Sequence, residues 1–433
     1  MSHSRTVEIE GHIIDSGTMQ RCFGAVMDLG GSFDVEQFDV GTHEEAESYC
    51  RMAVSADDEE TLRAILHELH QNGAVLENPS DVELVAAPAD KVVPPNFYST
   101  TNHPTEVLYD GEWIDVERIE MDCALVVDPE PETGPNGGPA NGPRAYTKVL
   151  NAVDEGDLVA TDQSGIRVNP PERPRSGGGA FGFMQGGVSS ERPSESTIRE
   201  VAAELREVKS TGGNVMVVAG PAVVHSGAGE ALARLVDAGY VDSLSAGNGF
   251  ATHDLERSLY GTSLGMDVET LEHPRKGHKH HIWTISEVIR AGGIEAAVEQ
   301  GKVTEGVMYQ CVENDVDTVL AGSIRDDGPL PDTITDAVEA QNAIREQAHD
   351  ADIVLMLATL LHSVAVGNCL PSTTKTVCVD INPATVTQLL DRGSAQAVGM
   401  VTDIGTFVPT LAEFVLDDGE TDGGRTVVTD DDE

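Results

Sequence analysis

The sequence has little positive charge and few aromatic side chains for its length. Only 27 of its 433 residues are Lys or Arg, against 74 Asp and Glu, and only seven of the 27 are lysines. Nucleic-acid binding needs clustered Lys and Arg that displace counterions, so a formal net charge of −47 argues against that function. A charge so large and so evenly spread resembles the surfaces of proteins from extreme halophiles, where concentrated salt screens self-repulsion.

Long apolar runs and cysteine pairs are also missing. No stretch of ~18 apolar residues exists to span a membrane, and residues 1–10 lack the apolar core of a secretion signal. We therefore expect a cytoplasmic protein. Six cysteines occur without a CxxC pair or any metal-like grouping, so we expect reduced, mostly buried thiols and no metal site.

The chain is long enough for two or three domains, because single cores rarely exceed ~250–300 residues. We predict a small α/β domain over residues 1–88, a β-rich middle subdomain with a linker over 89–190, a large α/β domain over 191–420 and an acidic tail over 421–433. In the first, hydrophobic periodicity predicts strands at 6–14, 32–40 and 51–55 and helices at 44–50 and 59–72, which together resemble a ferredoxin-like sandwich.

The middle region changes to short strands, which the pattern places at 113–119, 124–127 and 148–153. The stretch 129–143 is rich in turn residues and cannot support a core. A glycine run at 176–179 marks a boundary or a functional loop.

Six short apolar runs in the second half of the chain read as buried parallel strands, because each is continuous and ends at small or acidic residues. They alternate with helical stretches at 197–209, 229–238, 285–300, 332–349, 383–392 and 408–416, which predicts a doubly wound parallel sheet. The predicted strands are residues 215–219, 240–244, 316–320, 353–357, 376–379 and 398–401.

Ligands of such sheets bind where the turns after the strands gather, at the carboxyl edge. No GxGxxG motif opens the sheet, although Gly220-Pro221 followed by residues 227–229 can bring backbone amides to a phosphate. Asp380 ends a strand where it can accept from ribose hydroxyls, or else it caps the helix near Pro383. Thr359 and His362 follow another strand and offer groups to a pyrophosphate, unless they only begin a helix.

Two further stretches carry groups for chemistry. Arg325 lies beside two carboxylates and can hold a substrate carboxylate, although an acidic surface loop is the alternative. His253 and Asp254 can accept a proton near neutral pH. Lys279 lies in the His-rich segment 277–281, which is either part of the site or a solvated basic turn.

Several long blocks are similar to one family. Residues 5–88 resemble the LOR/SDH conserved region. Five further blocks resemble the archaeal ornithine cyclodeaminase family, namely Ala246-Gly247-Asn248-Gly249, His253-Asp254-Leu255-Glu256, 259–265, 322–331 and 379–383. The family also forms the carboxyl-terminal half of a bifunctional arginine dihydrolase/ornithine cyclodeaminase. The resemblance implies bound NAD, a Rossmann-like domain akin to deoxyhypusine synthase, and conversion of L-ornithine to L-proline and ammonia, without the arginine dihydrolase step.

From these blocks we expect His253 or Asp254 as the proton acceptor and Arg325 or Lys279 as the ligand of the substrate carboxylate. Another NAD-dependent amino-acid dehydrogenase, of opine or saccharopine type, and a non-catalytic NAD-binding sensor remain alternatives. The resemblance also implies assembly into a homo-oligomer. We expect NAD to be bound by Asn248, Gly249, Asp327, Thr359, Leu360, Leu361, His362, Asp380 and Asp403.

Overall fold

A computed structural model of the chain describes residues 3–14, 16–43, 46–131, 142–170, 194–267, 277–326, 328–392 and 397–416. The chain divides into two compact units. Unit 1 comprises Met1–Gln185, Gly367–Thr374 and Arg392–Ala397, and unit 2 comprises Gly186–Val366, Lys375–Asp391 and Val398–Glu433. Among the described residues, no helix is long and apolar enough to cross a membrane.

Unit 1 begins with a ferredoxin-like sandwich of two helices on a four-stranded antiparallel sheet, as predicted. The strand order is β2-β3-β1-β4, and β1 pairs with both β3 and β4. Asp58 starts the second helix by accepting a hydrogen bond from the Thr61 amide at 2.8 Å. The elements are β1 (His3–Gly11), α1 (Thr18–Asp28), β2 (Ser32–Asp39), β3 (Ser48–Ala56), α2 (Glu59–Gln71) and β4 (Val75–Leu76).

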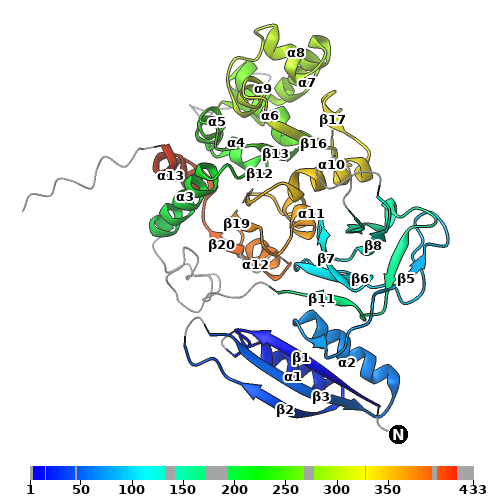
Figure 1. The fold of residues 1–433 in the computed structure, drawn as a ribbon. Helices are drawn as coiled ribbons and strands as arrows, with labels where there is room; N and C mark the ends of the chain where they lie inside the picture. The colour runs from blue at the N-terminus through cyan, green and yellow to red at the C-terminus, as the bar shows by residue number, and fades with distance from the viewer. Residues whose placement is uncertain are drawn as a thin grey trace, which may run out of the picture. The chain divides into compact units, whose positions relative to one another are not determined.

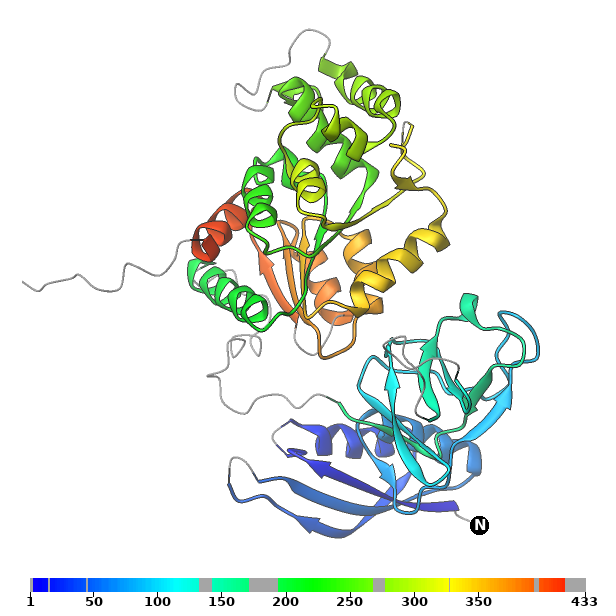
Figure 2. The same cartoon turned by 45° about the horizontal axis from the view of Figure 1, so that its top comes forward.

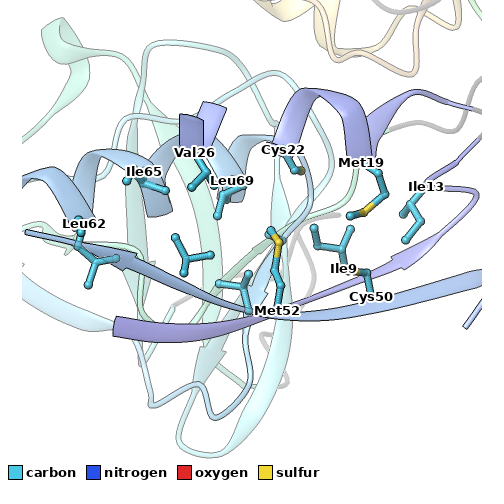
Figure 3. Close-up of a cluster of buried hydrophobic side chains, with 14 residues drawn as sticks. Ile9, Ile13, Met19, Cys22, Val26, Cys50, Met52, Leu62, Ile65 and Leu69 are labelled. Carbon is cyan, nitrogen blue, oxygen red and sulfur yellow. The ribbon is translucent and has the colours of Figure 1, made fainter. Parts of the chain in front are cut away.

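The core of this sandwich lies between the two helices and one face of the sheet, as Figure 3 shows. Strand β3 alternates buried and half-buried residues, so Cys50, Met52 and Val54 face the helices. Helices α1 and α2 pack against this face of the sheet with apolar side chains at helical spacing, so one face of each helix is buried. These helix side chains are Met19, Cys22, Val26, Leu62, Ile65 and Leu69.

The rest of unit 1 is β-rich, as predicted, and forms a seven-stranded sheet in the order β11-β6-β7-β9-β8-β10-β5. Its neighbouring strands run antiparallel, except β7 and β9, which are parallel. Its elements are β5 (Glu83–Ala86), β6 (Thr105–Tyr109), β7 (Glu112–Glu117), β8 (Ala124–Asp128), β9 (Arg144–Lys148), η1 (Leu150–Ala152), β10 (Leu158–Thr161) and β11 (Ile166–Val168).

Two predictions for unit 1 were wrong, and one helix was missed. The helix expected at 44–50 is replaced by the start of β3, because Ser48 and Cys50 belong to the alternating buried face; residues 44 and 45 lie outside the described part. The strand expected at 148–153 is instead the end of β9 followed by the 3-10 turn η1. Helix α1 was missed, although its buried Met19, Cys22 and Val26 repeat at helical intervals. The glycine run at 176–179 lies outside the described residues.

Unit 2 is a seven-stranded sheet in the order β17-β16-β13-β12-β18-β19-β20. Neighbouring strands from β17 to β19 run parallel, with Val217 opposite both Leu244 and Leu355. Strands β12 and β18 are buried along their whole length, which explains their unbroken apolar sequences. The strands are β12 (Val215–Ala219), β13 (Ser243–Gly247), β16 (Asp317–Ala321), β17 (Thr333–Ile334), β18 (Ile353–Leu357), β19 (Lys375–Asp380) and β20 (Ala397–Val401).

Helices cover both faces of this sheet (Figures 1 and 2). Helices α3 (Ser194–Ser210) and α13 (Ile404–Leu416) lie side by side on one face, and α10 (Ala337–His349), α11 (Leu361–Cys369) and α12 (Pro383–Arg392) lie on the other. The doubly wound prediction is therefore confirmed. Three more helices follow β12 and β13, namely α4 (Ala222–His225), α5 (Gly229–Asp237) and α6 (Asn248–Tyr260).

An insertion separates α6 from β16. It contains β14 (Thr262–Ser263), β15 (Met266–Asp267), η3 (Gly277–Lys279), α7 (His280–Ala291), α8 (Ile294–Glu299) and α9 (Val307–Glu313). The single helix predicted at 285–300 was wrong, because Gly292 and Gly293 have φ of 106° and 133° and end the helix there. The predicted helix at 332–349 begins later, at Ala337, after the Asp336 cap.

Candidate functional site

The order of the strands in unit 2 defines where a ligand can bind. Counted along the chain, the sheet grows outward from β12 through β13 to β16, and then restarts on the other side of β12 with β18, β19 and β20. The connection after β12 therefore runs toward β13, and the connection after β18 runs toward β19, on the opposite side of the sheet's centre. Such a reversal opens a crevice at the carboxyl ends of the two strands, and doubly wound folds bind nucleotides there.

The loops that follow β12 and β18 touch at this reversal. The Gly220 amide donates to the Leu357 carbonyl oxygen at 2.9 Å. A Cβ at Gly220 would overlap the carbonyl oxygen of Ala358 and lie 3.0 Å from Thr359 Cβ, so only glycine fits. Ala358 itself has a φ of 51°, which costs energy for a residue with a side chain. Strained backbone of this kind concentrates at functional sites.

The loops after β13, β16 and β18 also converge. His362, at the start of α11, lies against Gly247, where a Cβ would be only 2.9 Å from the imidazole Cε1. Burial lowers the pKa of His362, and the Asp326 carboxylate from the β16 loop partly opposes that shift. The structure thus brings Gly247 and His362 together, with Asp326 near enough to act electrostatically on the ring.

The Asn248 side chain is buried and holds the segment after β16 in place through hydrogen bonds. Its Oδ1 accepts hydrogen bonds from the Leu330 amide at 2.9 Å and from the Thr333 hydroxyl at 3.1 Å. These bonds fix the segment after β16 to the first turn of α6. The neighbouring Gly249 lies near the β12 loop, with a Cβ position 3.6 Å from Pro221 Cγ.

Asp380 lies at the end of β19, as predicted, and its carboxylate supports the next turn. Its Oδ1 accepts from the Asn382 amide at 2.7 Å, and Asn382 Oδ1 accepts from the Ala384 amide at 3.0 Å. The Asn382 side chain therefore binds an amide in the first turn of α12, and the Asp380 carboxylate holds Asn382 in place. In dinucleotide folds the ribose-binding acid usually follows the second strand, but β13 ends at Gly247 and Asn248 follows it.

The other predicted cofactor residues lie on strand-end loops. Thr359 is half-buried, whereas Leu360 and Leu361 have 42% and 78% of their surface exposed. Asp403 is exposed just before α13, at the end of β20. A Cβ at Gly405 would lie 2.9 Å from the Ser226 carbonyl oxygen, so this loop packs on the end of α4.

Arg325 lies in a closed turn after β16. Asp326 Oδ2 accepts from the Ser323 amide at 2.7 Å, and the Arg325 amide donates to Ser323 Oγ at 3.1 Å. The Arg325 side chain is exposed, and Asp327 lies outside the described residues. Lys279 is exposed at the junction of η3 and α7, in the insertion rather than on a strand-end loop.

His253 belongs to a hydrogen-bonded chain through α6, β14 and α7. Its Nδ1 lies 2.9 Å from Oε2 of Glu256, whose side chain is 0% exposed. Glu256 Oε1 accepts from the Thr262 hydroxyl and the Gly265 amide, both at 2.8 Å. Thr262 Oγ1 in turn lies 2.7 Å from His280 Nδ1. Burial alone would raise the pKa of Glu256, but its hydrogen bonds outweigh burial and hold that pKa below its usual value.

A second histidine, His225 of α4, contacts His253 in this hydrogen-bonded network. The rings of His225 and His253 meet edge to face, with centroids 4.9 Å apart, and His225 Nδ1 lies 2.6 Å from Ser263 Oγ. Burial, reinforced by His253, lowers the pKa of His225 to about 4. His225 follows Pro221 by one helical turn, and His253 follows Gly249 in the same way, so the pair lies one turn beyond the β12 and β13 loops.

Asp254 lies on a different side of α6 from His253. It is 2% exposed, and its Oδ2 accepts from the Met308 amide at 2.8 Å at the start of α9. Burial raises its pKa to about 6. It lines a polar cavity of about 790 Å³ between α5, α6 and α9, together with Arg234, Arg257 and Glu305. Gly229, from the predicted phosphate-binding stretch 227–229, also lines this cavity, whereas Gly220, Gly247, His362, Asp380 and Asp403 do not.

The sequence had given no role to Glu256 or His225, whereas His280 lies in the His-rich segment 277–281 that was expected either to join the site or to form a solvated turn. The three-residue spacing from His253 to Glu256 places both on one helix face and was an available signal. The contact between Thr262 and His280 has no such signal, because the fold brings the two residues together. Within the described ranges, no group of three or more His, Cys, Asp or Glu side chains is arranged to hold a metal ion. All six cysteines are buried and none forms a disulfide, as predicted.

Family models cover nearly all of the chain. The LOR/SDH bifunctional enzyme conserved region matches residues 4–103. The first region of the carboxyl-terminal part of ArgZ-like arginine dihydrolase matches residues 104–198, and the Rossmann fold of that part matches 199–411. The domain limits predicted from the sequence, at 88, 190 and 420, remain predictions.

Known proteins resemble the chain over most of its length. Ornithine cyclodeaminase from Methanothermobacter thermautotrophicus is 51% identical, over 94% of this chain and 97% of the relative. The structure of apo ArgZ, a cyanobacterial arginine dihydrolase, matches with a TM-score of 0.80 and 38% identity, covering 96% of this chain and 58% of ArgZ. The ternary complex of AgrE with ornithine and NAD+ matches with a TM-score of 0.51 and 42% identity, covering 96% of this chain and 57% of AgrE.

Proposed function

Because the chain belongs to the ornithine cyclodeaminase family, we propose that it converts L-ornithine to L-proline and ammonia with bound NAD as a hydride carrier. One observation carries the proposal beyond family membership. The glycine-lined contact of the β12 and β18 loops lies at the strand reversal, where doubly wound folds bind dinucleotides. AgrE, a relative of 42% identity, has been crystallised with ornithine and NAD+.

The residues at the strand ends fit NAD. Gly220 and Gly247 lack the side chains that would collide with the neighbouring loops, so the backbone there can approach a ligand closely. The Gly220-Pro221 turn opens the β12 crossover, where such folds hold the pyrophosphate. We assign the Asp380 carboxylate to the ribose hydroxyls, since one oxygen remains for a ligand after the bond to Asn382. Around the dinucleotide we further place Gly249, Thr359, Leu360, Leu361, His362 and Asp403, with Asn248 acting through its bonds to the β16 segment.

Bound NAD supplies a transient oxidation of the ornithine α-carbon, which lets the terminal amine close the ring with loss of ammonia before the ring is reduced again. The protein must position the α-carbon, hold the carboxylate, move protons on and off nitrogen and exclude water. We propose His253 as the proton acceptor, because Asp254 is engaged by the α9 amide and lines another cavity. Arg325 is the favoured ligand of the carboxylate, since Lys279 lies outside the strand-end loops.

The test is turnover with scarce NAD. Purified protein in concentrated salt is incubated with excess ornithine and NAD below the enzyme concentration, and proline and ammonia are measured. We expect many equivalents of both products per NAD, without accumulation of NADH. Product formation that stops at one equivalent, or none at all, rejects the proposal.

Two alternatives give different results in the same assay. An opine- or saccharopine-type dehydrogenase would convert stoichiometric NAD to NADH. A sensor would bind NAD without any ornithine-dependent release of ammonia. We favour the cyclodeaminase because its family resemblance spans both units of the chain.

We further propose that the enzyme works in the cytoplasm of a salt-rich cell, as a homo-oligomer in proline biosynthesis. The net charge of −47 supports the first part, because such a charge needs screening by salt. Light scattering in concentrated salt tests the assembly: a particle mass of 45.9 kDa would refute it.

A further inference from the structure

The fully buried Glu256 carboxylate determines the direction of every hydrogen bond around it. A carboxylate held ionised only accepts hydrogen bonds, so each of its partners must be a donor. His253 therefore carries its proton on Nδ1, and Thr262 directs its hydroxyl hydrogen toward Oε1. The neutral His253 ring then has Nε2 as its basic nitrogen.

The same reasoning extends to His280. A threonine hydroxyl has one hydrogen, and Thr262 uses it on Glu256, so toward His280 Nδ1 it can only accept. His280 thus also carries its proton on Nδ1. Two imidazoles direct their Nδ1 hydrogens toward a single anion, His253 directly and His280 through a hydroxyl.

We infer that Glu256 is a positioning residue for proton transfer, which keeps Nε2 of His253 ready to accept a proton and stabilises the ring once it is protonated. This inference rests on the proposed function, in which His253 accepts protons from substrate nitrogen. No bond of the substrate is made or broken by Glu256; the proton moves from substrate nitrogen to Nε2 and later returns to nitrogen or water. The arrangement follows the logic by which a buried carboxylate orients a catalytic histidine.

The other titratable groups near the pair support this assignment. His225, from α4, is the ring in contact with His253, and burial keeps it neutral at neutral pH, so it adds no positive charge there. His280 comes from α7 and stacks on Tyr260, with ring centroids 4.9 Å apart. Asp254 and Arg257, on the same helix, line the cavity between α5, α6 and α9 instead.

Replacing Glu256 by Gln tests the inference with an isosteric change. The amide nitrogen of Gln can donate to His253 Nδ1, which forces the ring into the tautomer protonated on Nε2. We expect kcat to fall by about 100-fold or more, in the range of lost general base catalysis, with KM for ornithine and Kd for NAD changed by less than about threefold. The acidic limb of the kcat profile should move to lower pH, because the protonated ring loses its anionic partner.

Glu287→Gln is the control, since Glu287 on α7 is a carboxylate that pairs with Arg290 and Lys302 and not with a histidine. We expect its kcat to stay within about twofold of the wild-type value. A Glu256→Gln enzyme with wild-type kcat and pH profile, measured beside an active parent, overturns the inference.

Nitrogen-15 NMR of histidine-labelled wild-type protein tests the tautomer directly and does not depend on any Glu256 variant folding. The His253 signal, assigned by its loss in His253→Gln, should show a protonated Nδ1 and a bare Nε2 in the neutral form of the ring. A neutral ring that carries its proton on Nε2 refutes the inference. If the parent makes no proline, the proposed function fails while this spectrum still decides the role of Glu256.

Discussion

Substituting Ala for Gly220 perturbs the contact on which the proposed NAD site depends. The added methyl group would overlap the Ala358 carbonyl oxygen, which is backbone and cannot rotate away, and would lie 3.0 Å from Thr359 Cβ. One of the two loops must therefore move. Overpacking of this kind typically costs about 1–3 kcal/mol of folding stability.

The effect on NAD binding follows from the same displacement. A loop that shifts by about an ångström loses an amide–phosphate hydrogen bond, and a bond to a charged group contributes about 1.5–3 kcal/mol. Because 1.4 kcal/mol corresponds to about a factor of ten, Kd for NAD should rise by about 10- to 100-fold. Titration calorimetry in concentrated salt measures this change.

Gly24→Ala provides the control. Gly24 lies inside helix α1 with no atom within 4 Å of the new Cβ, so the substitution should stabilise the helix by about 1 kcal/mol and leave NAD binding unchanged. A Gly220→Ala protein that is folded and binds NAD as tightly as the parent would refute the assignment of the site to the β12 and β18 loops.

Three further predictions concern the same unit and the acidic surface. Asp380→Ala should raise Kd for NAD by about 10- to 100-fold without unfolding the protein, and an unchanged Kd in a calorimetric titration would remove the ribose assignment. Burial raises the pKa of Asp254 from 3.8 to about 6, so the folded state retains a proton that the unfolded chain releases. The contribution of Asp254 to stability should thus fall by about 3 kcal/mol as pH rises from 4 to 6, and denaturant titrations of Asp254→Asn should lack this fall. The whole protein should lose stability as salt is diluted below about 1 M, and a melting temperature independent of salt would contradict the proposed adaptation.

The sequence predicted the parallel sheet well, because buried parallel strands have a signature that local context hardly alters. Strand β18 was located at its observed limits, and helix α12 likewise. The loops after β13, β16 and β18 were expected to meet, and Gly247 and His362 do lie together, with Asp326 near enough to act electrostatically on the ring. Parallel register and strand order guarantee such a meeting, because all carboxyl ends share one edge.

What could not be predicted depends on tertiary contacts. The segment before Arg51 looked helical, but it pairs with β1 and β2, and pairing with neighbouring strands overrides local propensity. Nothing in the sequence places His280 beside Thr262, since the two are joined through an insertion that folds back. Asp254 looked catalytic beside His253, yet successive helix residues point in different directions, and its carboxylate caps α9.

In the proposed reaction a hydride leaves the α-carbon of ornithine and returns to the same carbon. Ornithine carrying deuterium at the α-carbon, supplied with a trace of NAD, tests this return. We expect proline that retains the deuterium at its α-carbon, released with one equivalent of ammonia. Proline with the deuterium exchanged for solvent hydrogen, or labelled NADH that accumulates without proline, would contradict it.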